Sequence, residues 1–242
     1  MLAIEQSTSD FGKLKNLSLG NPINRGPWEF PRKSKLQGSY VRLELLTDEH
    51  IDDLWSFASA APESFTYLRY GPFQTREQLA ELISDLSSRE DQPFYAVLGK
   101  LGRAEGWLSI CDVYQGDGAF EIGSIWFAPS LQGSREAREA IFLLMCLGMD
   151  DFHYERLVWR CQAQNEDSFH AAINLGFKHE GTWRNAMVYD NWQRDVAWFS
   201  ILRSEWPLCR TAFEEWFRPE NFDEDWQQRR RLQDLRRVAG TQ

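Results

Sequence analysis

The sequence predicts an α/β (α+β) protein, with a mixed, mostly antiparallel central sheet of about seven strands and helices on both faces. Three observations lead to this fold class. The hydrophobic period changes from helical to strand-like near residue 94. The run Gln115-Gly116-Asp117-Gly118 lies between two strand-like segments and is typical of a hairpin turn, which makes its neighbours antiparallel. After that hairpin, strand-like and helix-like segments alternate, and this order favours helices on both faces of a mixed sheet.

The first third of the chain predicts an arm, a strand and two helices. Residues 1–38 are rich in Ser, Asn, Gly, Pro and Lys, and we expect an arm that drapes over the domain or is partly disordered. Residues 40–46 alternate apolar and polar side chains, as a strand does. Residues 47–58 and 75–88 place their apolar side chains on one helical face, and the segment between them, 62–72, predicts an aromatic-rich loop.

The remaining segments continue the alternation. Strands are expected over residues 94–99, 104–114, 119–127, 157–163, 177–189 and 196–202. Helices are expected over residues 136–151, 167–175 and 204–217, the last interrupted at Pro207, with a tail helix from Asp223.

The composition is that of a globular protein with many aromatic side chains. Hydrophobic residues make up 43% of the 242 residues and 11 residues are Trp, which favours packed sheet faces and pockets. The formal net charge of −9 disfavours nucleic acid as a partner, because such binders need a basic surface to replace phosphate counterions. An acidic surface attracts cationic ligands instead, and protonated amines are among them.

The placement of cysteine and histidine indicates neither disulfides nor a metal. Cys111, Cys146, Cys161 and Cys209 form no C-x-x-C pair, and no two of the four histidines have metal-ligand spacing. The first ten residues lack the apolar segment of a secretory signal, and the longest uncharged apolar run, 140–149, is far shorter than the ~20 residues that span a bilayer. We therefore expect reduced thiols, a cytoplasmic location, no metal cofactor and no membrane partner.

A loop of small residues follows the predicted strand 119–127 and opens into a helix. Such a loop presents unpaired backbone N–H groups and the positive end of the helix dipole, which together suit a pyrophosphate. An ordinary strand–loop–helix connection has the same appearance, so this segment alone leaves both interpretations open.

The loop contains the run Gln132-Gly133-Ser134-Arg135-Glu136-Ala137, and this run resembles the acetyl-CoA motif of the GNAT superfamily, Q/R-x-x-G-x-G/A. Gln132 matches the first position, Ala137 matches the last, and Gly133 is the glycine often found second. Arg135 occupies the position that usually holds the middle glycine, whose lack of a side chain lets the backbone approach the phosphates. Arg135 must therefore adopt a compatible backbone or point outward, where its guanidinium could clamp a phosphate itself. The resemblance implies a cofactor-binding segment made of Gln132, Gly133, Ser134, Arg135 and Ala137.

The resemblance continues along the chain. The segments Tyr154–Leu157 and Cys161–Ser168 are similar to the strand and helix start that follow in this superfamily. The stretches Asn174–Phe177 and Glu180–Arg184, and later Ser200–Trp206, resemble the RimJ/RimL-like branch, which acetylates N-terminal amines of ribosomal proteins. The resemblance covers about residues 38 to 207. It divides the chain into an N-terminal arm (1–38), a GNAT acetyltransferase domain (39–207) and a C-terminal helical extension (208–242).

The resemblance also implies a mechanism. Two adjacent parallel strands, 119–127 and 157–163, would splay apart at the centre of the sheet and admit the pantetheine arm of acetyl-CoA. Main-chain groups near Ile125 and Phe127 would bind that arm, and one N–H would polarise the thioester carbonyl. A primary amine would then attack directly in a ternary complex, without a covalent enzyme intermediate.

Candidate catalytic residues follow from the same comparison. Glu121 lies where the family often keeps a carboxylate, so it is either the general base or an ion-paired strand residue. Many relatives use a Tyr to protonate the leaving thiolate, but Ala172 stands at that position. Ser168 could hydrogen-bond the sulfur instead, or it could be a helix-start hydroxyl. Asn165 either contacts the pantetheine amide or caps the helix.

The acceptor is expected to be a peptide N-terminus or a small amine. Aromatic side chains are the candidates for its pocket, namely Tyr67, Tyr70, Phe73 and Trp192, although they could equally pack a loop onto the sheet. A second interpretation is a GNAT-shaped module that binds acyl-CoA and catalyses little, and the departures at Arg135 and Ala172 favour considering it. The chain lacks a G-x-G-x-x-G after a strand, which disfavours a dinucleotide oxidoreductase. The sequence leaves open whether the protein is a monomer or a homodimer.

Overall fold

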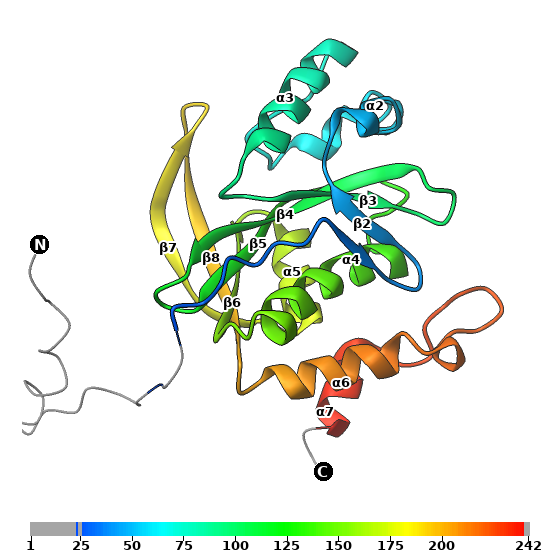
Figure 1. Ribbon diagram of the computed structural model, residues 1–242, viewed down its shortest axis with the longest axis vertical. Helices are drawn as coiled ribbons and strands as arrows, with labels where there is room; N and C mark the ends of the chain where they lie inside the picture. Colours follow the sequence, from blue (N-terminus) through cyan, green and yellow to red (C-terminus); the bar gives the residue numbers. More distant parts are fainter. Residues whose placement is uncertain (1–22, 24–25, 240–242) are drawn as a thin grey trace, which may run out of the picture.

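The structure, a computed structural model, describes residue 23 and residues 26–239 as one open sheet of eight strands with helices packed against it (Figure 1). The strand order is β1-β2-β3-β4-β5-β6-β8-β7. The strands are β1 (Lys35–Gln37), β2 (Arg42–Leu45), β3 (Phe94–Leu98), β4 (Ala104–Tyr114), β5 (Ala119–Phe127), β6 (Arg156–Gln162), β7 (Lys178–Tyr189) and β8 (Trp192–Leu202).

The described residues form six α-helices of 8 to 13 residues and several shorter helical turns. The α-helices are α2 (Ile51–Ala58), α3 (Arg76–Ser88), α4 (Arg135–Cys146), α5 (Glu166–Leu175), α6 (Trp206–Trp216) and α7 (Leu232–Ala239). The 3₁₀ turns are η1 (Asp48–His50), η2 (Pro62–Phe65) and η4 (Pro219–Asn221), and η3 (Leu147–Asp151) is a π-turn that extends α4.

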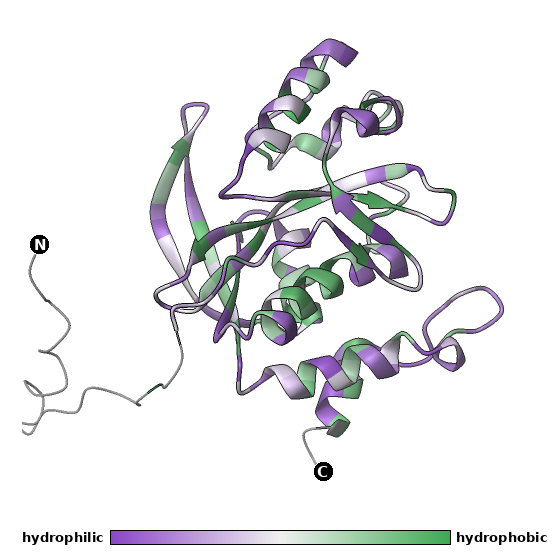
Figure 2. Ribbon diagram, viewed as in Figure 1, coloured by the Kyte–Doolittle hydropathy of each residue, from purple (hydrophilic) through white to green (hydrophobic). Residues whose placement is uncertain are grey.

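The two faces of the sheet carry separate hydrophobic clusters. Trp107 and Trp126 pack with α2 and α3, whereas Leu108, the residue after Trp107, packs with α4, α5, α6 and α7. Successive strand residues point to opposite faces, so the two sets of helices cover opposite sides of the sheet. Figure 2 shows α4 as largely hydrophobic, whereas the turn between β7 and β8 is hydrophilic.

The sheet opens at its centre, as the family resemblance implies. β5 and β6 are parallel, and every other neighbouring pair of these eight strands is antiparallel. The parallel pairing begins at Ala119↔Arg156 and ends at Glu121↔Val158, although β5 continues to Phe127 and β6 to Gln162. Because the pairing stops there, the second halves of the two strands diverge. This divergence creates the gap that positions the candidate site.

The structure has eight strands where about seven were expected. The additional strand, β1, lies inside the predicted arm and has only three residues, so it carries no detectable period. The arm also contains Trp28, which is buried and donates a hydrogen bond from Nε1 to the carbonyl oxygen of His153 over 2.8 Å. Residues 1–22 and 24–25 of the predicted arm lie outside the described residues.

The C-terminal prediction was wrong in two details. Pro207 does not interrupt a helix, because α6 begins at Trp206 and its first turn has no need of the missing N–H. The tail helix begins at Leu232 rather than Asp223. Residues 223–231 form a loop in which Asp223 Oδ1 accepts a 2.8 Å hydrogen bond from the N–H of Gln227.

The described residues include neither a metal-binding cluster nor a membrane-spanning helix. They contain no group of three or more His, Cys, Asp or Glu side chains arranged to hold a metal ion. None of the helices in this part of the chain has both the length and the apolar character needed to cross a bilayer.

Candidate functional site

The loop before α4 has the form of an anion-binding helix start. Gly133 adopts a φ of +69°, and a Cβ added there would meet nothing within 4 Å. Ser134 is the N-cap, and its Oγ accepts a 3.0 Å hydrogen bond from the N–H of Ala137. Gln132 donates from Nε2 to the carbonyl oxygen of Phe127 over 3.0 Å, which ties the loop to the end of β5. The other first-turn amides have no partner within the helix, so they can bind an anion.

A bulge lies in β5 just beyond the point where the pairing with β6 ends, and the sequence analysis missed it. The register between β4 and β5 shifts from Trp107↔Trp126 to Ser109↔Gly123, so β5 carries one more residue than β4 over this stretch. Ser124 lies in that bulge with a φ of +51°. Such a conformation is uncommon for a residue with a side chain and turns the local peptide groups out of the ladder. The small pair Gly123-Ser124 inside a strand is the sequence signal that could have indicated it.

Two hydrogen bonds hold the bulge in place. Tyr70 donates from its hydroxyl to the carbonyl oxygen of Ser124 over 3.3 Å, and Gln92 Nε2 donates to Ser124 Oγ over 3.2 Å. Tyr70 in turn accepts from Nε1 of Trp107 over 3.0 Å, and burial raises the pKa of its phenol. The phenol therefore stays protonated and acts here as a fixed donor.

Glu121 lies at the point where β5 and β6 separate. Its side chain is buried, and its Oε2 forms an ion pair with Nε of Arg160, which also pairs with Asp112. Burial raises the pKa of Glu121 to about 7, while the positive charge of Arg160 opposes that rise. A Cβ at Gly123 would lie 2.9 Å from Glu121 Oε1, so glycine leaves the room that this carboxylate occupies.

The start of α5 forms the other wall of the gap. Asn165 Oδ1 accepts a 3.1 Å hydrogen bond from the N–H of Ser168, so Asn165 is the N-cap of α5. Ser168 Oγ accepts from Nε1 of Trp159 over 3.1 Å. Its hydroxyl proton is therefore directed away from that indole. Ala172 is fully buried, so no phenol lies at the position where many GNAT enzymes place one.

The structure brings together only part of the predicted acceptor pocket. Tyr67 donates from its hydroxyl to the carbonyl oxygen of Gln164 over 3.1 Å, and so lies over the end of β6. Phe73 packs edge-on against Phe65, with ring centroids 5.2 Å apart, inside the cluster beneath α2 and α3. Trp192 is 70% exposed at the start of β8, opposite Tyr189. No contact joins it to Tyr67, Tyr70 or Phe73 within the described part of the chain.

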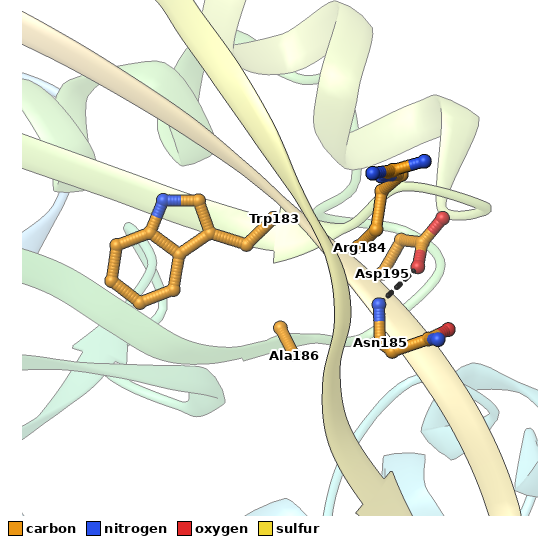
Figure 3. Close-up of a pocket in the computed structure, with 5 residues that line it drawn as sticks. All are labelled: Trp183, Arg184, Asn185, Ala186 and Asp195. Atoms are coloured by element: carbon orange, nitrogen blue, oxygen red, sulfur yellow. Dashed lines mark hydrogen bonds between the residues drawn. The ribbon is translucent and has the colours of Figure 1, made fainter.

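The β7–β8 hairpin carries a recess that the sequence analysis did not anticipate (Figure 3). The recess is open and shallow, has a volume of about 850 Å³, and is lined by Trp183, Arg184, Asn185, Ala186 and Asp195. It exists because β7 has two more residues than β8 between the pairs Trp183↔Val196 and Met187↔Arg194. Asn185 takes a φ of +53° in this bulge, and its N–H donates to Asp195 Oδ1 over 2.7 Å.

An aromatic and charged contact series connects this hairpin to Glu121. The rings of Trp183 and Trp198 have centroids 4.4 Å apart, and the guanidinium carbon of Arg160 lies 4.8 Å from the centroid of Trp198. Arg160 then reaches Glu121. The uncovered face beside the gap is therefore lined by aromatic rings and by charges of both signs.

Arg135 does not project freely from the helix start. Its guanidinium lies over three aromatic rings, at 3.8 Å from the centroid of Tyr40, 4.5 Å from that of Trp226 and 4.9 Å from that of Phe222. Arg135 is the first helical residue of α4, and Ser134 before it has an extended backbone. The helix start is thus accommodated without the glycine that relatives usually have.

The comparisons with known proteins agree with this geometry. The acetyltransferase (GNAT) domain family matches residues 41–178. A GCN5-related N-acetyltransferase from Brucella melitensis shares 37% identity and a TM-score of 0.86, with 88% of this chain and 99% of that chain covered. A probable GNAT-family acetyltransferase from Chromobacterium violaceum shares 31% identity and a TM-score of 0.73, over 79% of this chain and 98% of that chain.

A curated relative gives the same family over a shorter stretch. The uncharacterized N-acetyltransferase YnaD of Bacillus subtilis is 28% identical over 93 residues, which are 38% of this chain and about half, 54%, of that relative. The family match covers more than half of the 242 residues, and the open sheet parts between the two parallel strands. The chain therefore belongs to the GNAT acetyltransferase family, whose members are acetyl-CoA-dependent N-acetyltransferases.

Proposed function

We propose that this protein transfers an acetyl group from acetyl-CoA to a primary amine by direct attack in a ternary complex. The observation that carries the proposal is the buried Glu121 at the opening between β5 and β6, next to the Ser124 bulge. A proton acceptor and turned-out peptide groups lie together at the place where the sheet opens. Direct transfer between two bound substrates needs both.

The residues present fit acetyl-CoA. Gln132, Gly133, Ser134 and Ala137 form the helix start that would receive the pyrophosphate, because Gly133 leaves its surroundings open and the first-turn amides lack partners. Ile125 and Phe127 lie on the part of β5 that has lost β6 as a neighbour, so their peptide groups would bind the pantetheine arm. Asn165 uses Oδ1 to cap α5, and its amide NH₂ would remain for the cofactor.

Glu121 is the proposed general base. A carboxyl with a pKa of about 7 is partly ionised at neutral pH, and it would accept the proton that an attacking ammonium group must lose. The pairing with Arg160 holds the carboxylate in one place. The ion pair itself would equally suit a structural strand residue, and the raised pKa at the opening of the sheet is what favours the role of base.

Ser168 is the proposed donor to the leaving thiolate. Its oxygen accepts from the Trp159 indole, and its hydroxyl also contacts the thiol of Cys161, so the O–H group would turn from that thiol to donate across the gap. The Ala172 methyl group cannot take this role.

The acceptor would approach over the uncovered face between the η2–α3 loop and the β7–β8 hairpin. Tyr67 reaches this face from the loop, Tyr70 lies beneath it with its hydroxyl on the Ser124 bulge, and Trp192 stands at the far end of the hairpin. We propose a peptide N-terminus, as in the RimJ/RimL-like branch, or a small amine as the acceptor. A cytoplasmic setting accords with the four unpaired cysteines.

Release of free CoA thiol, measured across a panel of N-terminal peptides and small amines, tests the proposal. We expect release that depends on the amine, with peptides ahead of small amines if the branch assignment holds. Intact CoA binding without amine-stimulated release would support the alternative of a weakly catalytic acyl-CoA-binding module. Absence of CoA binding would contradict both.

A further inference from the structure

The first turn of α4 is held by a cage of three aromatic side chains around Arg135. One of these rings, Tyr40, comes from the segment before β2, and the other two, Phe222 and Trp226, come from the segment between α6 and α7. The Nε and Nη1 atoms of Arg135 are buried and have no hydrogen-bond partner among the described residues. The guanidinium is therefore stabilised mainly by cation–π contact, which planar arginine makes well.

A side chain of α4 also binds the segment that carries Tyr40. The buried carboxylate of Glu139, one turn after Arg135, accepts hydrogen bonds from the N–H groups of Ser39, Tyr40 and Val41 at 2.6 to 2.8 Å. Gly38 is required beside it, since a Cβ there would lie 2.4 Å from Glu139 Oε2. The turn that carries Tyr40 is thus bound to α4, and Tyr40 also donates from its hydroxyl to the carbonyl oxygen of Phe217 over 3.0 Å.

The C-terminal extension also contacts Arg138, a half-buried residue in the first turn of the helix. The guanidinium carbon of Arg138 lies 4.8 Å from the centroid of Trp216 on α6. Trp216 donates from Nε1 to Oε1 of Gln228 over 2.8 Å, which connects α6 to the loop that carries Trp226. Two arginines in the first turns of α4 therefore stack on aromatic rings of residues 208–242.

We propose that Arg135 is a positioning residue, and that the aromatic clamp of Tyr40, Phe222 and Trp226 orients the start of α4 for the phosphates of acetyl-CoA. This inference rests on the proposed function, because it assumes that the pyrophosphate binds at the loop before α4. A glycine at position 135 would adapt its backbone freely to a phosphate. An arginine anchored through its side chain instead fixes the backbone in one arrangement before the ligand arrives, which lowers the entropic cost of binding.

The clamp argues against a direct role of this guanidinium as the phosphate ligand. A guanidinium that lies within 5 Å of three ring centroids has its faces occupied, and two of its donor nitrogens are buried. Arg135, which replaces the family's glycine, would then hold the backbone amides of the helix start in position for the phosphates. The C-terminal extension would have a defined task in cofactor binding.

The test uses the full-length protein and Trp226→Ala. Trp226 is 63% exposed, so the protein should still fold without it, and thermal unfolding checks this. We expect the Kd for CoA and the KM for acetyl-CoA to rise about fivefold, with kcat at saturation unchanged. S-acetylpantetheine lacks the nucleotide phosphates, so its kcat/KM as acetyl donor should not change. Trp226→Phe should restore most of the affinity, and Glu224→Ala, an exposed neighbour in the same loop, should match the unsubstituted protein.

The outcomes separate this inference from the function on which it rests. Unsubstituted protein that fails to bind CoA would contradict the proposed function and, with it, the clamp. Normal CoA binding that is unaffected by Trp226→Ala would overturn the clamp alone. An equal loss with acetyl-CoA and with S-acetylpantetheine would also overturn it, because a general structural effect does not depend on phosphates. If Trp226→Ala does not fold, Arg135→Lys, which keeps the charge and loses the planar group, provides the same comparison.

Discussion

The guanidinium of Arg160 pairs with a carboxylate of Glu121 that is only 6% exposed. Burial makes the charged form of Glu121 costly, and Arg160 offsets part of that cost. The balance leaves the pKa at about 7, near the pH at which a base must both accept and release protons. This pair is the part of the site whose chemistry can be tested most directly.

Replacement of the proposed base should remove one limb of the pH–rate profile. In the unsubstituted enzyme kcat/KM should rise with pH through about 7, because only the ionised Glu121 accepts the proton of the amine. Glu121→Gln should lower kcat/KM by roughly 100-fold or more and remove that rise. Glu44→Gln, on the distant strand β2, is the control. An unaltered pH profile in Glu121→Gln would exclude Glu121 as the base.

The same carboxyl should make stability depend on pH. Its pKa is higher in the folded protein, at about 7, than its ordinary value of 4.5, so the folded state binds more protons between these values. The contribution of Glu121 to stability is therefore fully present below pH 4.5 and is lost as the pH rises through about 7. We expect the Tm difference between the unsubstituted protein and Glu121→Gln to move in favour of the variant from pH 5 to pH 8. A constant difference over this range would contradict the prediction.

Loss of Arg160 should move the titration of Glu121 upward. Arg160 is the largest influence that lowers the pKa of Glu121, so Arg160→Met should shift the limb of kcat/KM from about pH 7 to higher pH. Its removal also leaves a buried carboxylate without its cation, which lowers stability at alkaline pH. The measurement is the pH dependence of kcat/KM at saturating acetyl-CoA. A limb that stays in place would show that Arg160 does not influence the reacting form of Glu121.

A charge in the loop before α4 should prevent phosphate binding. Gly133→Asp introduces a side chain at a φ of +69° and places a carboxylate beside the expected pyrophosphate. We expect the Kd for CoA, measured by calorimetry, to rise at least about tenfold. Gly102→Asp is a matched control, because Gly102 has a φ of +74° and equally open surroundings in another turn. Equal affinity in the two variants would show that the phosphates bind elsewhere.

The alternation of apolar and polar residues predicted the central strands of the sheet. It did not predict the short strand β1 or the residues with a positive φ. The expected strands 104–114 and 119–127 have the bounds of β4 and β5, because long alternating runs leave little choice of period. β1 escaped prediction since three residues cannot display a period. The supposed helix after Asp223 is a loop, because contacts of Asp223 with local N–H groups compete with helix formation.

The sequence likewise predicted some residues of the candidate site and missed others. Glu121, Gln132 and Gly133 could be named from motif positions, and the structure places them at the opening of the sheet and at the start of α4. Ser124 was missed, because the Gly123-Ser124 pair only suggests a bulge, whereas its positive φ is held by hydrogen bonds from Tyr70 and Gln92, which are distant in sequence. Local pattern does not report on contacts of this kind.

The bulge at Asn185 has a consequence for the protein outside catalysis. β7 is the last strand of the sheet and extends for 12 residues, so its outer side exposes backbone groups that another chain could recruit into a continuous ladder. Two surplus residues at the middle of β7 break the regular spacing of those groups. The bulge therefore divides the long edge strand β7 into two short segments. Each short segment is a poorer template for pairing with another chain than an unbroken edge strand.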